Sequence, residues 1–338
     1  MDELFNDSLP QDAFQVGDFY YQIIDDDHHV SVCRLANEEI AEVHIPAQIE
    51  YNGQVYHVTE VDSEAFDSCY NVIAITFPEG ITRIQCGSFS NTVNLAHVSL
   101  PSSLRVIEEF GFSHCDLESI VIPEGVTTIK GGAFFDCVEL KSVVIPEGVT
   151  TIDAGAFDDC IELKSINIPG SIVTLSGGFF CDFKNLTSVT ISEGLESIEE
   201  GAFYGCKHLP SIAIPNSVTS IGEEVFNYCY DLHSIVVESG NPVYDSRNNC
   251  NAIIETASGK LIAGCKATII PDGVTSIADY AFAGCRALSS IVIPNTVTSI
   301  GKEAFKDCTS LISITIPKSV THIGENAFAK HIQVIREE

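Results

Sequence analysis

The sequence contains no tryptophan, a single methionine and few positive charges. Its 338 residues include 17 Lys and Arg against 47 Asp and Glu, so the formal net charge is −30. A field of that sign repels nucleic acid and anionic lipid head groups, and we expect neither as a partner. The acidity fits solubility alone, and it also fits attraction of a basic partner or of Ca²⁺. The sequence leaves these interpretations open.

Long apolar runs are missing as well. No stretch approaches the roughly 18 apolar residues that a membrane-crossing helix needs, so we expect no membrane insertion. Residues 1–7 (MDELFND) have neither the basic region nor the apolar region of a signal peptide. If Met1 is the native start, the sequence predicts a cytoplasmic protein. The hydrophobic content of 45% predicts an ordered core rather than a disordered chain.

The motifs of common enzymes and metal sites are also absent. There is no Gly-x-Ser-x-Gly elbow, no P-loop, no dinucleotide fingerprint and no Cys-x-x-Cys pair. Adjacent carboxylates at Asp158 and Asp159, or Glu199 and Glu200, have nothing to desolvate them and separate their pKa values for acid–base catalysis. Residues 25–29 (DDDHH) contain possible metal ligands, but consecutive extended residues point to opposite faces. We therefore expect no enzyme, no cofactor and no metal site.

A repeat of 23 residues dominates the sequence. Units such as PEGVTTIKGGAFFDCVELKSVVI, from Pro123, and PEGVTTIDAGAFDDCIELKSINI, from Pro146, are nearly identical. Units start at positions 78, 101, 123, 146, 169, 192, 215, 271, 294 and 317. The step from 101 to 123 is one residue short, the step from 215 to 271 is more than twice the period, and an atypical unit covers residues 55–77. Self-similarity at a fixed period predicts a stack of structural repeats that share one continuous core.

Within each unit the apolar residues follow a fixed order. In one unit they are Val149, Ile152, Phe157, Cys160, Leu163, Ile166 and Ile168. The Leu-x-Ser-Ile-x-Ile end alternates like a short strand, and the Val-Thr-x-Ile head predicts a second one. The Ala-Phe-x-x-Cys-x-x-Leu segment between them has helical spacing and room for a single helical turn. We expect parallel strands on the concave side, with turns, short strands and single helical turns on the convex side.

This form of unit resembles the BspA-like leucine-rich repeats, known from bacterial surface antigens and some protist proteins. The resemblance covers residues 55–328 and lacks the Asn that usually follows the strand of a leucine-rich repeat. It implies a leucine-rich-repeat solenoid that binds proteins, with a cell-surface or secreted location and adhesion to host or matrix protein. An intracellular bacterial scaffold and a Ca²⁺-dependent binding module are the alternatives.

The ends of the chain and one interruption depart from the repeat. Residues 1–54 alternate like strands and include Asn52-Gly53, which is typical of a hairpin turn, so we expect an N-terminal β-hairpin cap. A solenoid of about eleven coils then occupies residues 55–330, and residues 331–338 supply a C-terminal cap strand. The long step of the repeat contains the extra residues 238–270, which predict a β-hairpin insertion. The sequence leaves open whether this hairpin stands out from the stack or extends its sheet.

Eight of the 13 cysteines share one repeat position. They are Cys69, Cys115, Cys137, Cys160, Cys206, Cys229, Cys285 and Cys308. Because they lie between the Phe and Leu positions, we expect them to point into the core as small hydrophobic side chains. Neighbours about 5 Å apart are within disulfide range, but parallel side chains in an apolar core favour reduced thiols. Unpaired thiols fit a reducing compartment.

Candidate partner-binding residues come from two surfaces. The outward positions of the Leu strands carry small, nearly uniform residues, among them Ser142, Val144, Ser165 and Asn167. A serine ladder there can close its hydrogen bonds internally. Side chains typical of binding hot spots lie around the late repeats and the insertion, namely Tyr204, Tyr228, Tyr230, Tyr244 and Arg247. We expect these residues to bind a protein and the chain to be a monomer.

Overall fold

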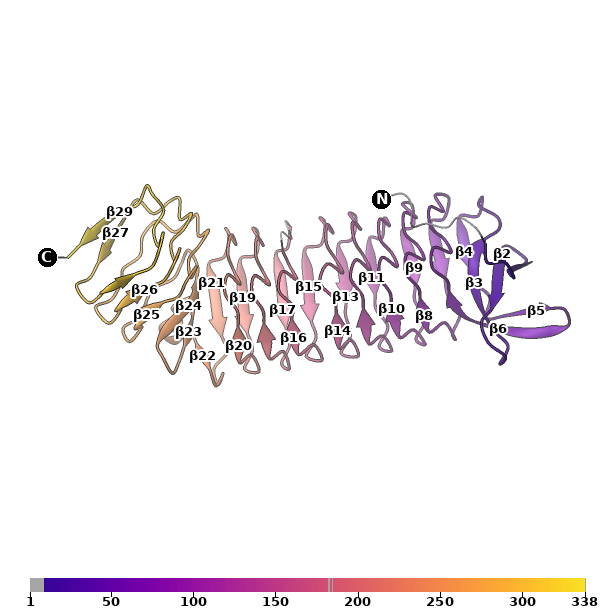
Figure 1. Cartoon of the computed structure of the whole chain (residues 1–338), viewed down its shortest axis with the longest axis horizontal. Coiled ribbons are helices and arrows are strands. Elements are labelled where there is room, and N and C mark those ends of the chain that lie inside the picture. Colours follow the sequence, from indigo (N-terminus) through magenta and orange to yellow (C-terminus); the bar gives the residue numbers. More distant parts are fainter. Residues whose placement is uncertain (1–8, 182, 184, 338) are drawn as a thin grey trace. The chain divides into compact units, whose positions relative to one another are not determined.

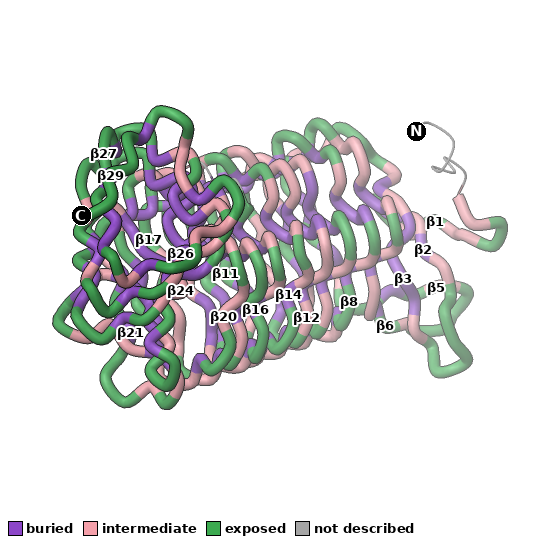
Figure 2. Tube along the Cα trace, turned by 60° about the vertical axis from the view of Figure 1, so that its left-hand side comes forward, coloured by how far each residue is buried: buried purple, intermediate pink, exposed green. Residues whose placement is uncertain are grey.

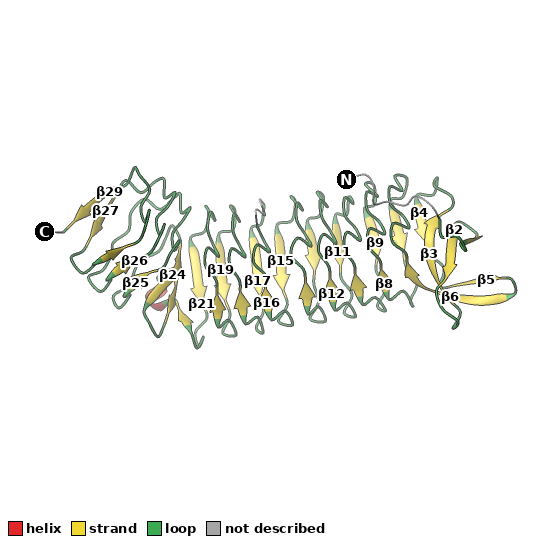
Figure 3. Ribbon diagram, in the orientation of Figure 1, coloured by secondary structure: helices red, strands yellow, loops and turns green. Residues whose placement is uncertain are grey.

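The computed structural model describes residues 9–181, 183 and 185–337. Residues 1–8 of the expected N-terminal cap and residue 338 of the expected C-terminal cap strand lie outside this range. The chain is a β-solenoid of about 12 turns with parallel strands and almost no helix (Figure 3), which confirms the solenoid expected from the repeat. It divides into two compact units, Met1–Glu162 and Leu163–Glu338.

The first unit begins with five strands outside the repeat and a sixth that belongs to the atypical unit at residues 55–77. They are β1 (Phe14–Val16), β2 (Phe19–Ile23), β3 (His29–Leu35), β4 (Glu42–His44), β5 (Gln48–Tyr51) and β6 (Gln54–Val61). β1, β2 and β3 are antiparallel neighbours, and β3 pairs in parallel with β6. β5 and β6 form an antiparallel hairpin, whose turn residues Asn52 and Gly53 have φ angles of 53° and 77°. A two-residue hairpin turn of type I′ requires positive φ at both of these positions.

Each coil of the first unit contributes strands to two parallel sheets (Figure 1). The strand face consists of β7 (Ala74–Thr76), β9 (His97–Ser99), β11 (Ser119–Val121) and β13 (Ser142–Val144). The narrow face consists of β8 (Arg83–Ile84), β10 (Val106–Ile107), β12 (Thr128–Ile129) and β14 (Thr151–Ile152). Equivalent repeat positions pair, for instance Ser119 with Ser142 and Ile107 with Ile129. The repeat therefore sets the register of both sheets.

The third side of each coil, which we call the turn face, contains the Ala-Phe-x-x-Cys segment. Among the described residues this segment forms successive turns and not the expected helical turn, with bonds such as that from Cys137 N to Phe134 O (3.3 Å). Left-handed residues at two positions, here Gly132 (φ 66°) and Asp136 (φ 54°), interrupt any right-handed run. The N–H of Asp136 instead donates to the carbonyl of Asp158 in the next coil (2.9 Å). Hydrogen bonds between coils therefore extend to the turn face.

A column of phenylalanine rings fills the core of the first unit. Phe66, Phe89, Phe112, Phe134 and Phe157 stack with centroids 4.9, 5.1, 5.6 and 5.2 Å apart in that order. None of the five is more than 2% exposed. In successive coils the buried segments alternate with exposed corners (Figure 2). The inward direction expected for Phe157 is thus confirmed.

The second unit is built from the same two kinds of strand. Its strand face contains β15 (Ser165–Ile168), β17 (Ser188–Ile191), β19 (Ser211–Ile214), β21 (Ser234–Val237), β27 (Ser313–Ile316) and β29 (Gln333–Arg336). Its narrow face contains β16 (Thr174–Leu175), β18 (Ser197–Ile198), β20 (Ser220–Ile221), β25 (Ser276–Ile277), β26 (Ser299–Ile300) and β28 (His322–Ile323). Phe203 and Phe305 are fully buried, as the repeat predicts. β29 pairs in parallel with β27 and ends the described strand face.

The insertion at residues 238–270 is part of the narrow-face sheet. It contains β22 (Tyr244–Asp245), β23 (Ala252–Glu255), β24 (Lys260–Gly264) and the 3-10 helix η1 (Arg247–Asn249), the only helix in the part of the chain that the structure describes. β22, β23 and β24 are antiparallel neighbours, and β24 pairs in parallel with β25. Ile254 and Leu261 are fully buried in the core. The hairpin extends the sheet and does not stand out from the stack.

Candidate functional site

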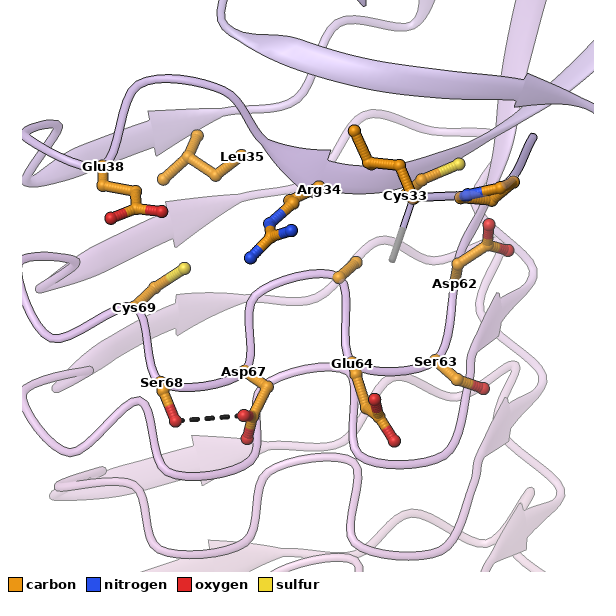
Figure 4. A pocket seen from close by; sticks show the side chains of 13 residues that line it. Cys33, Arg34, Leu35, Glu38, Asp62, Ser63, Glu64, Asp67, Ser68 and Cys69 are labelled. Atoms are coloured by element: carbon orange, nitrogen blue, oxygen red, sulfur yellow. Dashed lines mark hydrogen bonds between the residues drawn. The ribbon is translucent and has the colours of Figure 1, made fainter. Parts of the chain in front are cut away.

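A polar cavity of about 610 Å³ lies in the first unit, between the end of β3 and the first turn of the repeat. Figure 4 shows the Arg34 side chain extending from β3 into this space, with Glu38, Glu64 and Asp67 around it. Because carboxylates outnumber the single guanidinium in this lining, the cavity is acidic. Two of its lining residues, Cys33 and Cys69, carry thiols that are potential nucleophiles.

The thiols of this cavity are held in their protonated form. Burial, reinforced by the charges of Glu38 and Asp67, raises the pKa of Cys69 to about 11. Burial and then Asp62 raise the pKa of Cys33 well above its ordinary value. A thiol with a raised pKa is a poor nucleophile at neutral pH, because the thiolate is the reactive species. The cavity therefore lacks the chemistry of a cysteine-dependent active site.

The acidic residues that the sequence analysis considers as catalytic or metal-binding candidates interact with neighbouring groups of the fold. Asp25 accepts hydrogen bonds from the ring of His29 (2.6 Å) and from the N–H of Asp27, and the bond from His29 lowers the pKa of Asp25. Contrary to expectation, burial and then Asp159 raise the pKa of Asp158. Within the described residues no group of three or more His, Cys, Asp or Glu side chains could hold a metal ion. The turn at residues 25–29 is closed by its own side chains.

The candidate residues on the strand face are at least partly exposed, but their side chains are small and carry no charge. Ser142 and Val144 lie on β13, where Val144 is 53% exposed and pairs with Val121, which is 66% exposed. Ser165 and Asn167 lie on β15 of the second unit, exposed and partly exposed respectively. The serine hydroxyls of this row form no hydrogen bonds with one another in the described part of either unit, so the ladder that the sequence allows does not form there. These four residues could make contacts of small area, and none of them is an aromatic or arginine side chain typical of a binding hot spot.

Part of the strand face in the second unit has no strands. Residues 267–270 and 290–293 occupy strand-face positions in the repeat but form no strand. Their outward residues Ile269 and Val292 are 73% and 81% exposed. Exposed apolar side chains of this kind can contribute contact area to an interface, and they form the second surface that a partner could use.

Four residues meet on the turn face of the second unit, and we call them the tyrosine platform: Tyr204, Tyr228, Tyr230 and Arg286. The rings of Tyr204 and Tyr228 are 5.1 Å apart between centroids, and those of Tyr228 and Tyr230 are 6.5 Å apart. The guanidinium carbon of Arg286 lies 4.4 Å from the centroid of the Tyr230 ring. All three rings are partly exposed, and Arg286 is exposed. Tyrosine and arginine are enriched in binding hot spots, so this is the candidate contact site.

Sequence reasoning found the three tyrosines of the platform but missed Arg286. Tyr230 directly follows Cys229, and Arg286 directly follows Cys285, so both occupy one repeat position. The insertion lies between them in the chain and hides this equivalence. Alignment of the units around the insertion is the signal that predicts their contact.

The backbone of Tyr228 is unusual for an aromatic residue. Its φ is 61°, at a position where other coils have Asn91, Asp136, Gly284 or Asp307. The Tyr228 hydroxyl donates to Asp307 Oδ2 at 2.9 Å. A Cβ on Gly284 would lie 2.7 Å from the Tyr228 nitrogen, so only glycine fits beneath it. Burial and then Asp307 raise the pKa of Tyr228, which keeps the hydroxyl a donor. A left-handed bulky residue is costly and is retained only where its surroundings fix it.

Tyr244 and Arg247 have internal roles in the insertion. Tyr244 is 7% exposed, and its hydroxyl accepts the N–H of Ile221 at 3.1 Å. The Arg247 Nε donates to Asp245 Oδ1 at 2.7 Å, and its guanidinium forms an ion pair with the same carboxylate. These contacts attach the insertion to the preceding coil and fix its first turn. The structure does not bring the two residues into the platform.

Charge is distributed unevenly between the units. Residues 1–162 include 5 Lys and Arg against 29 Asp and Glu, a net charge of −24. Residues 163–338 include 12 Lys and Arg against 18 Asp and Glu, a net charge of −6. The candidate contact site therefore lies in the unit with the weaker negative field.

Parallel strands of equivalent residues, a column of buried rings and a 23-residue repeat define a leucine-rich-repeat protein. The family described as BspA type leucine rich repeat region matches residues 59–186, 151–252 and 262–336, in six copies. The chain belongs to this family, which confirms the resemblance noted in the sequence.

Solved structures of bacterial proteins share the fold. A leucine-rich cell surface protein from Faecalibacterium prausnitzii A2-165 is 27% identical, with 95% of this chain and 86% of that one covered and a TM-score of 0.59. A leucine-rich-repeat protein from Bacteroides ovatus ATCC 8483 is 25% identical, with 96% and 90% covered and a TM-score of 0.61. A leucine-rich-repeat protein from T. pallidum is 29% identical, with 64% and 88% covered and a TM-score of 0.51.

The comparison with curated proteins found no match. Among the residues that the structure describes, no helix is long and apolar enough to cross a membrane.

Proposed function

We propose that the chain is a non-catalytic protein-binding module that attaches to host or matrix proteins at the cell surface. Membership of a leucine-rich-repeat family supports protein binding. The similarity to a solved structure described as a cell surface protein supports the location. The observation that carries the proposal is the tyrosine platform, which brings hot-spot side chains together on the outer surface of the second unit.

The platform has the physical properties of an interface centre. Tyrosine rings contribute a large contact area and lose little side-chain entropy on binding. Arginine adds hydrogen-bond donors with a defined direction. The hydrogen bond from Tyr228 to Asp307 fixes one ring before any partner arrives, so less conformational freedom is lost on binding. Ile269 and Val292, exposed on the strand face of the second unit, form a separate apolar surface that a partner could also contact.

Binding to a panel of purified, immobilised extracellular host proteins tests the proposal. The full chain should bind at least one of them saturably, and the double variant Tyr230→Ala/Arg286→Ala should bind at least about tenfold more weakly. The matched control is Tyr280→Ala/Lys302→Ala, which removes a second cation–ring pair (Lys302 Nζ 5.5 Å from the Tyr280 centroid) outside the platform. Circular dichroism establishes that both variants are folded. Absence of binding across the panel, or equal loss in both variants, contradicts the proposal.

A scaffold role inside the bacterial cell is the second candidate. All 13 cysteines, each of them among the described residues, are free thiols, and free thiols persist in a reducing compartment. The same chain and variants, tested against cytoplasmic protein from the producing cell, separate the two candidates. Platform-dependent binding to a cytoplasmic protein, with none to the extracellular panel, would select the scaffold.

A further inference from the structure

We infer that the tyrosine platform recognises a segment of the partner protein that carries a carboxylate beside an apolar or aromatic side chain. The inference rests on the proposed function and adds the chemistry of the segment that is bound. Two features of the platform carry it: the unpaired guanidinium of Arg286, and the fixed aromatic surface next to it.

Arg286 is a cation without a carboxylate partner among the described residues. Two acidic side chains that adjoin platform residues already have partners. Asp307 accepts the Tyr228 hydroxyl, and Asp231 pairs with His208 Nδ1 at 2.9 Å. The Arg286 guanidinium instead lies over the Tyr230 ring, 4.4 Å from its centroid. A guanidinium held over a ring keeps N–H donors at its edge, where a carboxylate can accept two of them.

The rings of the platform supply the apolar half of the recognition. Tyr204 and Tyr228 are in contact, with centroids 5.1 Å apart, and both are partly exposed. Tyr228 is fixed from one side by its bond to Asp307 and lies against Gly284. An apolar or aromatic side chain can pack on such a surface while a neighbouring carboxylate reaches Arg286. Burial of the apolar contact would also shield the ion pair from water, which strengthens it.

Two positive charges at the platform are open to an acidic segment, because the neighbouring carboxylates of Asp307 and Asp231 already have partners. Lys207, on the turn face near Tyr204 in sequence, carries a second positive charge and has no ion-pair partner among the described residues. A Lys or Arg of a partner would approach Arg286 and Lys207 against like-charge repulsion. The net charge of −24 on the first unit repels an acidic segment far more than the −6 of the second unit does. Acidic recognition is therefore feasible at the platform and unfavourable on the first unit.

Selection from a random peptide display library, with the full chain as bait, tests the inference. Enriched peptides should contain Asp or Glu close in sequence to an aromatic or aliphatic residue. Titration of one synthetic peptide then gives affinities for the wild type and for single variants. Arg286→Ala and Tyr230→Ala should each weaken binding at least about tenfold, Arg286→Glu should weaken it more, and Tyr280→Ala should leave it unchanged. The same selection with the Arg286→Glu variant as bait should enrich peptides that contain basic residues in place of acidic ones.

Several outcomes overturn the inference. Selected peptides without acidic enrichment do so, as do acidic peptides whose affinity is unchanged by Arg286→Ala. Stronger competition by a carboxylated polysaccharide than by the peptide would assign the platform to a glycan. If platform variants abolish binding to a panel protein but the acidic peptide does not compete for it, the inference fails while the proposed function stands. If acidic peptides bind the platform but no panel protein does, the inference stands while the proposed function fails.

Discussion

Cysteines of the core column act as hydrogen-bond donors. The thiol donates to the Phe carbonyl of the preceding coil; for Cys115, Cys137 and Cys160 the Sγ to O distances are 3.1, 3.0 and 3.1 Å. In one coil without this cysteine, Thr92 occupies the position, and its hydroxyl donates to the carbonyl of Phe66 at 2.6 Å. Most coils therefore place a small buried donor at this position, whereas one coil has the buried Phe183 there. Burial raises the pKa of Cys137 to about 12, so its thiol keeps the proton that it donates.

Replacement of Cys137 by Thr and by Val tests this role, because the two side chains have nearly the same shape. Val leaves the buried carbonyl of Phe112 without a partner, whereas Thr supplies a hydroxyl donor. We expect Cys137→Thr to be more stable than Cys137→Val by about 1 kcal/mol in urea unfolding, although Val is the more apolar. A more stable Val variant would show that the position selects apolar volume alone.

Glu79 links two coils in a way that depends on pH. Its carboxylate accepts the N–H groups of Ser102 and Ser103, at 3.1 Å each, and the bond from Ser102 lowers its pKa below the ordinary 4.5. A group with a lowered folded pKa stabilises the fold above its unfolded pKa, and this stabilisation is lost as the pH falls through the folded value. Glu79→Gln should therefore lower the melting temperature at neutral pH and have progressively less effect below about pH 4.5.

The matched control is Glu124→Gln. Glu124 occupies the same corner of another unit but makes no such bond to the described residues of the next coil. Its replacement should change the melting temperature little at any pH. A pH-independent effect of Glu79→Gln would contradict the electrostatic origin of the link.

At the scale of elements, stacked phenylalanine rings fill part of the core of each unit. Phe157 is 2% exposed and stacks on Phe134 with an interplanar angle of 2°. Phe157→Ala removes a large core side chain and should cost about 3–5 kcal/mol of unfolding free energy. An unchanged midpoint of urea unfolding would contradict its place in the core.

The insertion is expected to behave as core structure in mutational tests. Leu261 on β24 is fully buried beside Ile277, whereas its neighbour Lys260 is exposed. Leu261→Ala should therefore cost about 2–5 kcal/mol, as in the core of a coil. The control Lys260→Ala should change stability by no more than about 0.5 kcal/mol. Equal, small effects of both changes would indicate a loop that contributes nothing to the stack.

The sequence predicts the elements well where side-chain pattern determines them. Both strand types and the Asn52-Gly53 hairpin follow from apolar alternation and turn chemistry. The helical turn is wrong because the turn face depends on backbone conformation. Left-handed residues there include Phe110 and Tyr228, whose side chains do not favour positive φ. Hydrogen bonds between neighbouring coils fix these residues, and no pattern within one unit contains that information.

At the scale of the whole molecule, the candidate site could be predicted in part. Tyr204, Tyr228 and Tyr230 have side chains typical of interfaces, and the structure brings them together. Tyr244 and Arg247 are close to them in sequence, but their polar groups are used inside the insertion. Residue type and proximity in sequence therefore predict candidates, while the stacking of coils around the insertion decides which of them share a surface.

Hydroxyl-radical footprinting of the full chain, free and bound to a protein from the extracellular panel, tests the central claim most directly. The claim is that the chain acts through side chains on its outer surface, centred on the tyrosine platform. Binding should strongly protect Tyr204, Tyr228 and Tyr230 and leave the buried Phe157 unreactive in both states. Protection confined to the strand face, at Val144 or Val292, with unchanged reactivity of the three tyrosines would contradict the account.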